Sequence, residues 1–530
     1  MSSPTLTSTS ASPAGTGKTT HKASLPSRGK LIVLIITAAV LIAACFAALL
    51  WNRFWPFTEK AVVQDLAEAS DSAVTIRSSH RTYFPFPGCI LEGVEFHHGP
   101  DKWTLITIDK LTVEGSYSGI VTKRVPRIRA EGGHVFVPPF GSHVTFTTQH
   151  SNLVVEELVA NGTVVEFASN DPSKKPLRFE VQQGVLRDVR WNTPIDYDLK
   201  FHNPEPPGEV AARGKFGVWI KGNPGETPLS GEYTFDQANL GVYGGVGGIL
   251  SSKGKYNGVL KHIDIAGTTE VPDFEVNTGG HKVKLVTQYT AFVDATHGDT
   301  FLKHVEAHFR RTNVAVEGSV AGVKGRKGKT ALFDLSSRQG RIEDILGLFV
   351  SEPRAPMSGP ITLKAKVEIP PGKERFLEKV KLQCSFGIED GTFSKPETQK
   401  NVNELSAGAL GEKMEDAETV LTDLKGQVVL EGGIAKFSDL SFGIPGAKAR
   451  MHGTFNLLNH KIDLHGRMQV DTKISKTTTG VKALLLKLMD PFFKKHKKGE
   501  VVPIHITRTY EHPQFGLDIS EQKAPPSPHK

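Results

Sequence analysis

Residues 361–369 read ITLKAKVEI, a stretch in which apolar and polar residues alternate strictly. Ile361, Leu363 and Val367 share one parity, and Thr362 belongs to the other. Successive side chains of a β-strand point to opposite faces, so the stretch predicts a strand with one apolar face and one solvated face. Antiparallel sheets that face water on one side produce this alternation.

The same period of two recurs along the chain in both directions. Residues 380–388 read VKLQCSFGI, and residues 462–470 read IDLHGRMQV. Turn signals such as Gly222-Asn223-Pro224-Gly225 and Gly432-Gly433 separate the alternating runs. We therefore expect a mainly β fold, built from antiparallel strands between about residues 103 and 519.

Few segments interrupt the strand pattern with helical spacing. We expect helices over residues 59–69, 341–349, 402–410 and 481–496. The last segment has apolar residues on one side and lysines around them. It is interpreted either as a cap on the end of the sheet or as a helix that docks on an anionic membrane or closes the mouth of an apolar groove.

The apolar face of such strands must be covered by something. A sandwich covers it with protein, whereas a long curved sheet leaves it facing an internal groove that acyl chains fit. Ordinary protein core explains each single residue equally well. The candidate lining residues are taken from alternation alone and are Ile361, Leu363, Val367, Val380, Leu382, Phe386, Ile462, Leu464, Met468 and Val470.

An uncharged run near the N-terminus predicts a transmembrane helix. Residues 31–51 read LIVLIITAAVLIAACFAALLW, and about 20 apolar residues span the hydrocarbon of a bilayer. A cleaved signal peptide has a shorter apolar core, so we expect an uncleaved helix over residues 31–52. Lysines and arginines precede the run, which places residues 1–30 in the cytoplasm and the body outside. Trp51, Trp55 and Phe57 are expected to anchor the helix at the interface.

The composition of the 530 residues, 38% hydrophobic and 23% charged, is that of a folded protein. The net charge is +8, but the cations form local clusters without interleaved aromatic residues, which argues against nucleic-acid binding. A disulfide between Cys89 and Cys384 is conceivable, but we expect free, buried thiols. Cys45 lies inside the apolar run.

Motifs that carry catalysis or bind metal are missing from the sequence. It contains no GxSxG, HExxH or CxxC pattern. His97 and His98 are adjacent, so on a strand they would face opposite ways, and we expect them to lie at a turn. We therefore predict no catalytic residues, no cofactor and no bound metal, and a protein that is not an enzyme. An enzyme whose site assembles from distant residues stays an alternative.

Three stretches carry a family likeness. Residues 86–94 read FPGCILEGV, residues 359–393 are followed by TQKNVNELS at 398–406, and residues 444–458 read IPGAKARMHGTFNLL before VPIHI at 502–506. With these stretches the chain resembles the AsmA-like family of bacterial envelope proteins, the AsmA, TamB and YhdP relatives that form repeating β-grooves.

The resemblance implies an elongated, curved antiparallel β-groove of the β-taco type after the transmembrane helix. It also implies a place in the bacterial inner membrane, a periplasmic body, and the binding or conduction of phospholipid between inner and outer membranes for envelope maintenance and outer-membrane biogenesis. Periplasmic or outer-membrane proteins are implied partners, since the groove is short for this family. The alternative function is a non-catalytic scaffold that assists outer-membrane protein assembly.

The expected organisation follows from the membrane run and the resemblance. It comprises a disordered cytoplasmic tail over 1–30, a transmembrane helix over 31–52, an N-terminal AsmA-like region over 53–140, a β-rich groove over 141–400, an AsmA-like C-terminal region over 401–519 and a disordered tail over 520–530.

Overall fold

The computed structural model divides the chain into two units, Met1–Thr58 and Glu59–Lys530. It describes residues 40–46, 55–99, 103–139, 152–168, 176–323, 328–372, 374–394, 421–444, 447–470, 501–509 and 513–517. Both expected tails, most of the apolar run and the expected helices over 402–410 and 481–496 lie outside these residues.

The first unit is described over two short segments. Residues 40–46 are helical and exposed. None of the helices within the described ranges has the length and apolar character needed to cross a membrane. Trp55 and Phe57 are buried and pack edge to face with ring centres 5.8 Å apart. The prediction that these two side chains form an interfacial anchor is therefore wrong, because an anchor has to be exposed.

The second unit is mainly β, as predicted, and its described residues form 26 strands joined in one sheet. The strands of its first half are β1 Ala73–Thr75, β2 Ser78–Thr82, β3 Gly88–His98, β4 Trp103–Glu114, β5 Arg124–Val137, β6 Val154–Phe167, β7 Leu177–Val189, β8 Ile195–Pro204, β9 Pro207–Phe216, β10 Pro228–Asn239, β11 Val246–Gly247, β12 Ile249–Val259 and β13 His262–Val276. Those of its second half are β14 Val283–Asp294, β15 Asp299–Phe309, β16 Thr312–Gly322, β17 Lys329–Arg341, β18 Met357–Ser358, β19 Pro360–Ile369, β20 Lys381–Phe393, β21 Leu421–Glu431, β22 Ile434–Ile444, β23 Ala447–Asn456, β24 Lys461–Val470, β25 Val501–Thr509 and β26 Pro513–Leu517.

Among the described residues of this unit, one helix precedes the first strand and the other helices are short and lie between strands. They are α2 Glu59–Ser70, α3 Gly119–Thr122, α4 Ile342–Leu346 and α5 Phe376–Lys379, with 3₁₀ turns η1 Pro224–Glu226 and η2 Leu240–Tyr243. The helices expected over 59–69 and 341–349 are confirmed, the second one in part. Strands begin at Ala73, some 30 residues earlier than expected. β1 and β2 are short, and in β3 the alternation is broken at Gly93, where φ is +60° and the buried parity changes from Leu91 to Val94.

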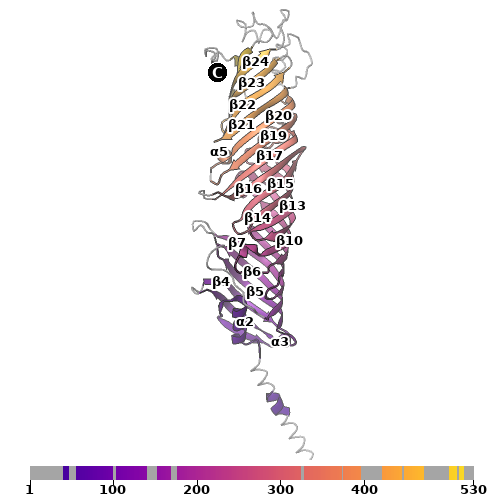
Figure 1. The fold of residues 1–530 in the computed structure, drawn as a ribbon, viewed down its shortest axis with the longest axis vertical. Coiled ribbons are helices and arrows are strands. Elements are labelled where there is room, and N and C mark those ends of the chain that lie inside the picture. The colour runs from indigo at the N-terminus through magenta and orange to yellow at the C-terminus, as the bar shows by residue number, and fades with distance from the viewer. Residues whose placement is uncertain are drawn as a thin grey trace, which may run out of the picture. The chain divides into compact units, whose positions relative to one another are not determined.

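Strand pairing follows chain order, and Figure 1 shows successive strands side by side. From β3 to β10 and from β12 to β26, each long strand pairs with the next long strand. All pairs are antiparallel except β5 with β6, so the prediction of a wholly antiparallel sheet is wrong at one place. Residues 138–153 connect these two strands, which is enough chain for the return crossover that a parallel pair requires.

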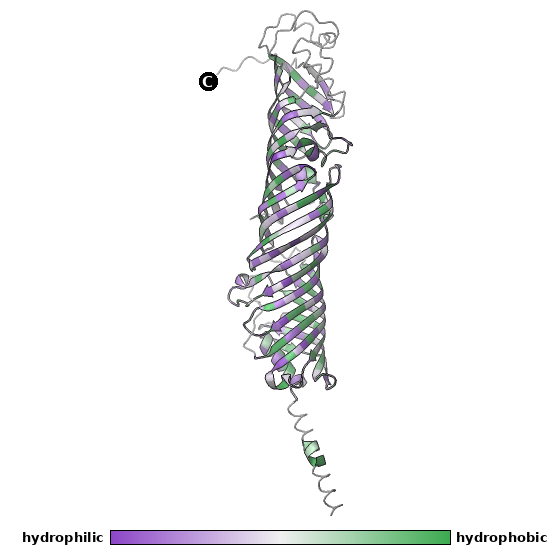
Figure 2. Cartoon of the chain, turned by 90° about the vertical axis from the view of Figure 1, so that its right-hand side faces the viewer, coloured by the Kyte–Doolittle hydropathy of each residue, from purple (hydrophilic) through white to green (hydrophobic). Residues whose placement is uncertain are grey.

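The two faces of the sheet differ along most strands, and Figure 2 shows the alternation as stripes. The outward face, called here the polar face, carries cross-strand ion pairs such as Lys215–Asp196 at 2.8 Å and Lys381–Glu431 at 2.9 Å. Opposite charges on adjacent strands help to fix register. The other face, called the apolar face, carries the apolar parity of each strand and is half-buried or buried.

The sheet has two long edges formed by the strand ends. The first rim carries the β12–β13, β14–β15 and β19–β20 connections, and hence α5. The second rim carries the β13–β14, β15–β16 and β17–β19 connections, and hence α4 and η2. A strand of about 12 residues separates the rims by roughly 40 Å in a flat sheet.

Contacts between opposite rims show that the sheet curls. The ring of Phe376 in α5, on the first rim, packs on Gly245 beside η2, on the second rim six pairings away. Lys221 Nζ, on the first rim between β9 and β10, lies 3.8 Å from Asp71 Oδ2, which precedes β1 on the second rim, seven pairings away. A flat sheet would hold these groups tens of ångströms apart. The sheet therefore winds so that its rims meet, and the apolar face lies on the concave side.

Candidate functional site

The candidate residues on β19 and β20 lie together on the apolar face. Leu363 is paired with Phe386, and Val367 with Leu382. Ile361 is paired with Ile388 and is buried. The parity of these residues is therefore the one predicted from alternation.

Register extends this group to β24 across three intervening strands. Leu382 pairs with Leu430, Leu430 with Ala435, Ala435 with Phe455, and Phe455 with Ile462. An unbroken apolar row thus crosses five strands. Leu464 and Met468 share the parity of Ile462 along β24, and Val470 is described only by its backbone pairing with Ala447.

Burial divides the candidates into two groups. Ile361 packs with Ile342 of α4 at the second rim, and Val380, just before β20, packs with Leu430 near α5 at the first rim. Met468 is buried with Leu421. These three are ordinary core residues, which is the alternative left open by the sequence.

The remaining described candidates are half-buried. They lie between the two rims, on the concave side of a sheet that has no second layer among the described residues. This second group therefore presents apolar surface that protein covers only in part. It consists of Leu363, Val367, Leu382, Phe386, Ile462 and Leu464.

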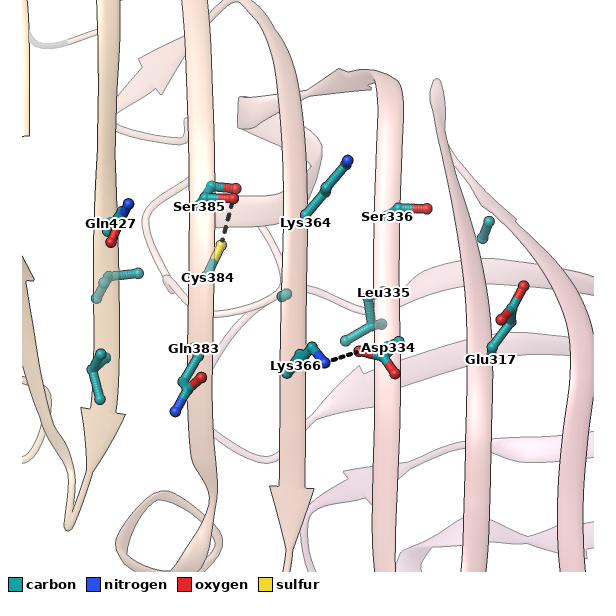
Figure 3. A pocket seen from close by; sticks show the side chains of 14 residues that line it. Glu317, Asp334, Leu335, Ser336, Lys364, Lys366, Gln383, Cys384, Ser385 and Gln427 are labelled. Carbon is teal, nitrogen blue, oxygen red and sulfur yellow. Dashed lines mark hydrogen bonds and ion pairs between the residues drawn. The ribbon is translucent and has the colours of Figure 1, made fainter.

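A hollow of about 520 Å³ adjoins strands β16 to β21. It is lined by the row Leu335, Ala365, Cys384 and Val428, and by residues on either side of this row. Figure 3 shows Cys384 on β20 and the pair Lys366–Asp334, whose charged atoms lie 3.7 Å apart. The volume is that of a small-ligand site. Its titratable side chains are those of Glu317, Asp334, Lys364, Lys366 and Cys384, and the Cys384 thiol donates to the backbone carbonyl oxygen of Ser385 at 3.7 Å.

Tyrosine rings and glycines occupy the apolar face further toward β8. Tyr197 on β8 pairs in register with Gly214, then Gly231, then Tyr256 on β12, and the two hydroxyls are hydrogen-bonded to each other. Because the glycines have no side chains, the rings lie along the sheet rather than standing up from it. Burial raises the pKa of Tyr197 and of Tyr256, so both hydroxyls are neutral.

The same arrangement recurs at Tyr233 and Tyr289, whose hydroxyls also meet. Ser252 joins this pair, with its Oγ 3.2 Å from the Tyr233 hydroxyl and 3.3 Å from the Tyr289 hydroxyl. Thr269 donates to Ser252 Oγ at 3.2 Å. A patch of mutually bonded hydroxyls therefore interrupts the apolar face in the middle of the sheet.

The sequence also made predictions about the cysteines, the adjacent histidines and metal binding. Cys89 is free and buried, and Cys384 is free and half-buried, so neither forms the conceivable disulfide. His97 and His98 end β3 rather than forming a turn, and His97 lies 3.1 Å from Thr75 Oγ1. Within the described ranges, no cluster of three His, Cys, Asp or Glu residues is arranged to hold a metal ion.

Sequence reasoning missed the tyrosine–glycine rows. The signal was present as Gly231-Glu232-Tyr233 and Gly254-Lys255-Tyr256, where glycine and tyrosine share one parity. Which glycine faces which tyrosine depends on register, and register between strands is set by turns and bulges rather than by one strand alone.

Comparison with protein-family models, with curated proteins and with solved structures finds nothing that matches this chain.

Proposed function

We propose that the chain is a membrane-anchored protein of the AsmA-like kind that binds or conducts phospholipid along its apolar face. In this proposal residues 31–52 cross the bacterial inner membrane and the sheet lies in the periplasm as a β-groove. Acyl chains rest on the apolar face, while head groups stay in water at the mouth between the rims. Transfer is passive, follows a gradient or an external energy source, and serves envelope maintenance.

One observation carries the proposal: an apolar row, buried at Leu430 and Ala435 and half-buried at its other positions, runs across five strands from β20 to β24 on the concave side of a curled sheet. A row of this kind runs across the strands, along the long direction of the sheet from one strand to the next. An acyl chain needs continuous apolar surface without specific polar contacts, and this row offers it.

The length of the ladder is compatible with carrying lipid well beyond one bilayer. From β3 to β26 the sheet makes 21 successive pairings of long strands. At about 4.8 Å per pairing the sheet measures roughly 100 Å along its curved surface. A bilayer with its head groups is about 40–45 Å thick. Bridging two membranes is proposed to involve a partner protein in the outer membrane or periplasm.

A non-catalytic scaffold for outer-membrane assembly is the second candidate. It is favoured by the clusters at α4 and α5, where Ile342 and Val380 are buried against sheet residues. If such packing continued along the whole concave side, the sheet would have an ordinary core and no room for lipid.

Mass spectrometry of lipid that remains with the detergent-washed full chain tests the proposal. We expect the double variant Leu363→Glu, Leu464→Glu to retain ~tenfold less lipid, because contact with an ionised carboxylate costs an acyl chain several kcal/mol. The matched control Thr362→Glu, Gln469→Glu changes exposed residues of the polar parity on the same two strands. Because the control keeps residues 31–52, lipid held around the membrane segment is the same in both variants and cancels in the comparison. Equal lipid in both folded variants would refute the groove and favour the scaffold.

A further inference from the structure

Two loops at one end of the first rim expose aromatic side chains. The β2–β3 loop carries Tyr83, Phe84 and Phe86, which are 47%, 89% and 57% exposed. The loop between β4 and α3 carries Tyr117, which is 51% exposed. Both loops adjoin the same rim, because Gly88 at the start of β3 pairs with Glu114 at the end of β4. These four residues are called here the aromatic loop pair.

Hydrogen bonds tie the two loops together. The Tyr117 hydroxyl donates to the carbonyl oxygen of Tyr83 at 2.7 Å, and the backbone N–H of Gly115 donates to the carbonyl oxygen of Pro87 at 2.8 Å. Pro87, between Phe86 and β3, is fully buried. The aromatic residues are thus presented on a fixed base. While these hydrogen bonds hold, the exposed aromatic side chains cannot fold back onto the protein.

The chemistry around the aromatic loop pair is that of a membrane interface. The phenylalanine rings are wholly apolar and the tyrosine rings add a polar hydroxyl tip, a combination that suits the boundary between acyl chains and head groups of a bilayer. Arg81 and Lys123 are exposed next to the loops. The segments 76–91 and 115–130 contain no Asp or Glu, so nothing within them opposes anionic lipid.

The position of the loops along the chain points to the same partner. Tyr83 follows the end of the apolar run at Trp51 by only 32 positions. Exposed aromatic clusters of this kind are rare on soluble proteins unless something covers them. We propose that the aromatic loop pair inserts into the head-group zone of an anionic phospholipid bilayer. This proposal rests on the proposed membrane attachment of the chain and not on lipid binding by the apolar face.

Photo-crosslinking of the full chain in liposomes tests the insertion. The photoreactive residue p-benzoylphenylalanine replaces Phe84, in vesicles of phosphatidylethanolamine and phosphatidylglycerol. The control places it at Phe349, which is 44% exposed after α4 at the other rim. We expect at least fivefold more lipid adduct at position 84 than at position 349, read by mass spectrometry. Equal yields, or adducts with protein rather than lipid at position 84, would overturn the proposal.

Two further measurements separate this proposal from the proposed function. Flotation of the vesicles reports membrane attachment by itself, and a chain that does not float refutes both. Repeating the crosslinking in the Leu363→Glu, Leu464→Glu background removes lipid from the apolar face only. Adducts at position 84 that persist there come from the bilayer, and adducts that vanish there would show that position 84 met groove lipid instead.

Discussion

The hydroxyl of Tyr233 meets the hydroxyl of Tyr289 above two glycines that belong to the strands between them. In register, Tyr233 on β10 faces Gly254 on β12, which faces Gly267 on β13, which faces Tyr289 on β14. Each ring therefore occupies the place where a neighbouring side chain would stand. A flat-lying ring covers two strands without reducing the width of the concave space.

A methyl group at Gly254 should destabilise the sheet. Its Cβ would lie 2.5 Å from the carbonyl oxygen of Ala266 and 2.9 Å from Cε1 of Tyr233, closer than such contacts allow. We expect Gly254→Ala to cost about 1–3 kcal/mol, as overpacking in cores does. The measurement is the denaturant midpoint of the full chain in detergent.

Gly322→Ala is the matched control for this change. Gly322 also lies within a strand, and a Cβ there would meet nothing within 4 Å. We expect its midpoint to stay within the error of wild type. An equal decrease of the denaturant midpoint in the two variants would mean that the effect comes from the backbone flexibility of glycine and not from the contact between Gly254 and the Tyr233 ring.

The contact between the rims at Gly245 predicts an engineered disulfide. The Cγ of Phe376 lies 2.8 Å from where a Cβ of residue 245 would be, and Phe376 Cβ is one bond further. Cβ atoms of a disulfide are about 3.5–4.5 Å apart. The variant Gly245→Cys, Phe376→Cys, in a background of Cys45→Ser and Cys384→Ser, should oxidise to one intramolecular crosslink. Non-reducing electrophoresis detects it as a faster band.

The pair Gly222→Cys, Phe376→Cys is the control for this crosslink, because Gly222 lies on the same rim as α5. We expect no crosslink there under the same oxidant. If the first pair also failed to crosslink, the sheet would be more open than described. If it formed, the amount of retained lipid would report whether lipid leaves between the rims.

Alternation along single strands predicted which face of β19, β20 and β24 is apolar, because side-chain direction follows from the strand period alone. Alternation did not distinguish Ile361, buried by α4, from Leu363, which stays half-buried two residues away. That difference arises from a helix contributed by another part of the chain. Local sequence carries no information about it.

The parallel pairing of β5 with β6 and the meeting of the rims were also beyond sequence reasoning. The parallel pairing depends on the path of the connection between the two strands. The meeting of the rims at Gly245 depends on curvature that adds up over six strand pairings. The membrane run remains a prediction, because residues 31–39 and 47–54 are outside the described residues, and so does the resemblance.

Acid should weaken the attachment of α4 through Glu343. Burial by itself raises the pKa of Glu343, but donors from the Gly359 N–H, its own N–H and the Arg341 side chain outweigh it and hold the pKa below the ordinary 4.5. A lowered pKa stabilises the fold above the unfolded value and loses this contribution as pH falls through the folded value. Between about pH 6 and pH 3, wild type should therefore lose more thermal stability than Glu343→Gln. Parallel losses would exclude a role for this carboxylate.

Removal of lipid should expose Cys384 to thiol reagents. Cys384 lies half-buried on the apolar face, in the row between Ala365 and Val428, and burial raises the pKa of its thiol. If acyl chains cover this row, a maleimide should label Cys384 several-fold faster in delipidated protein than in lipid-loaded protein, as followed by peptide mass spectrometry. Cys89 is an internal control, since its thiol is buried by protein, which raises its pKa to about 12, and it should stay unlabelled in both samples. Identical labelling of Cys384 with and without lipid would mean that lipid does not occupy this part of the apolar face.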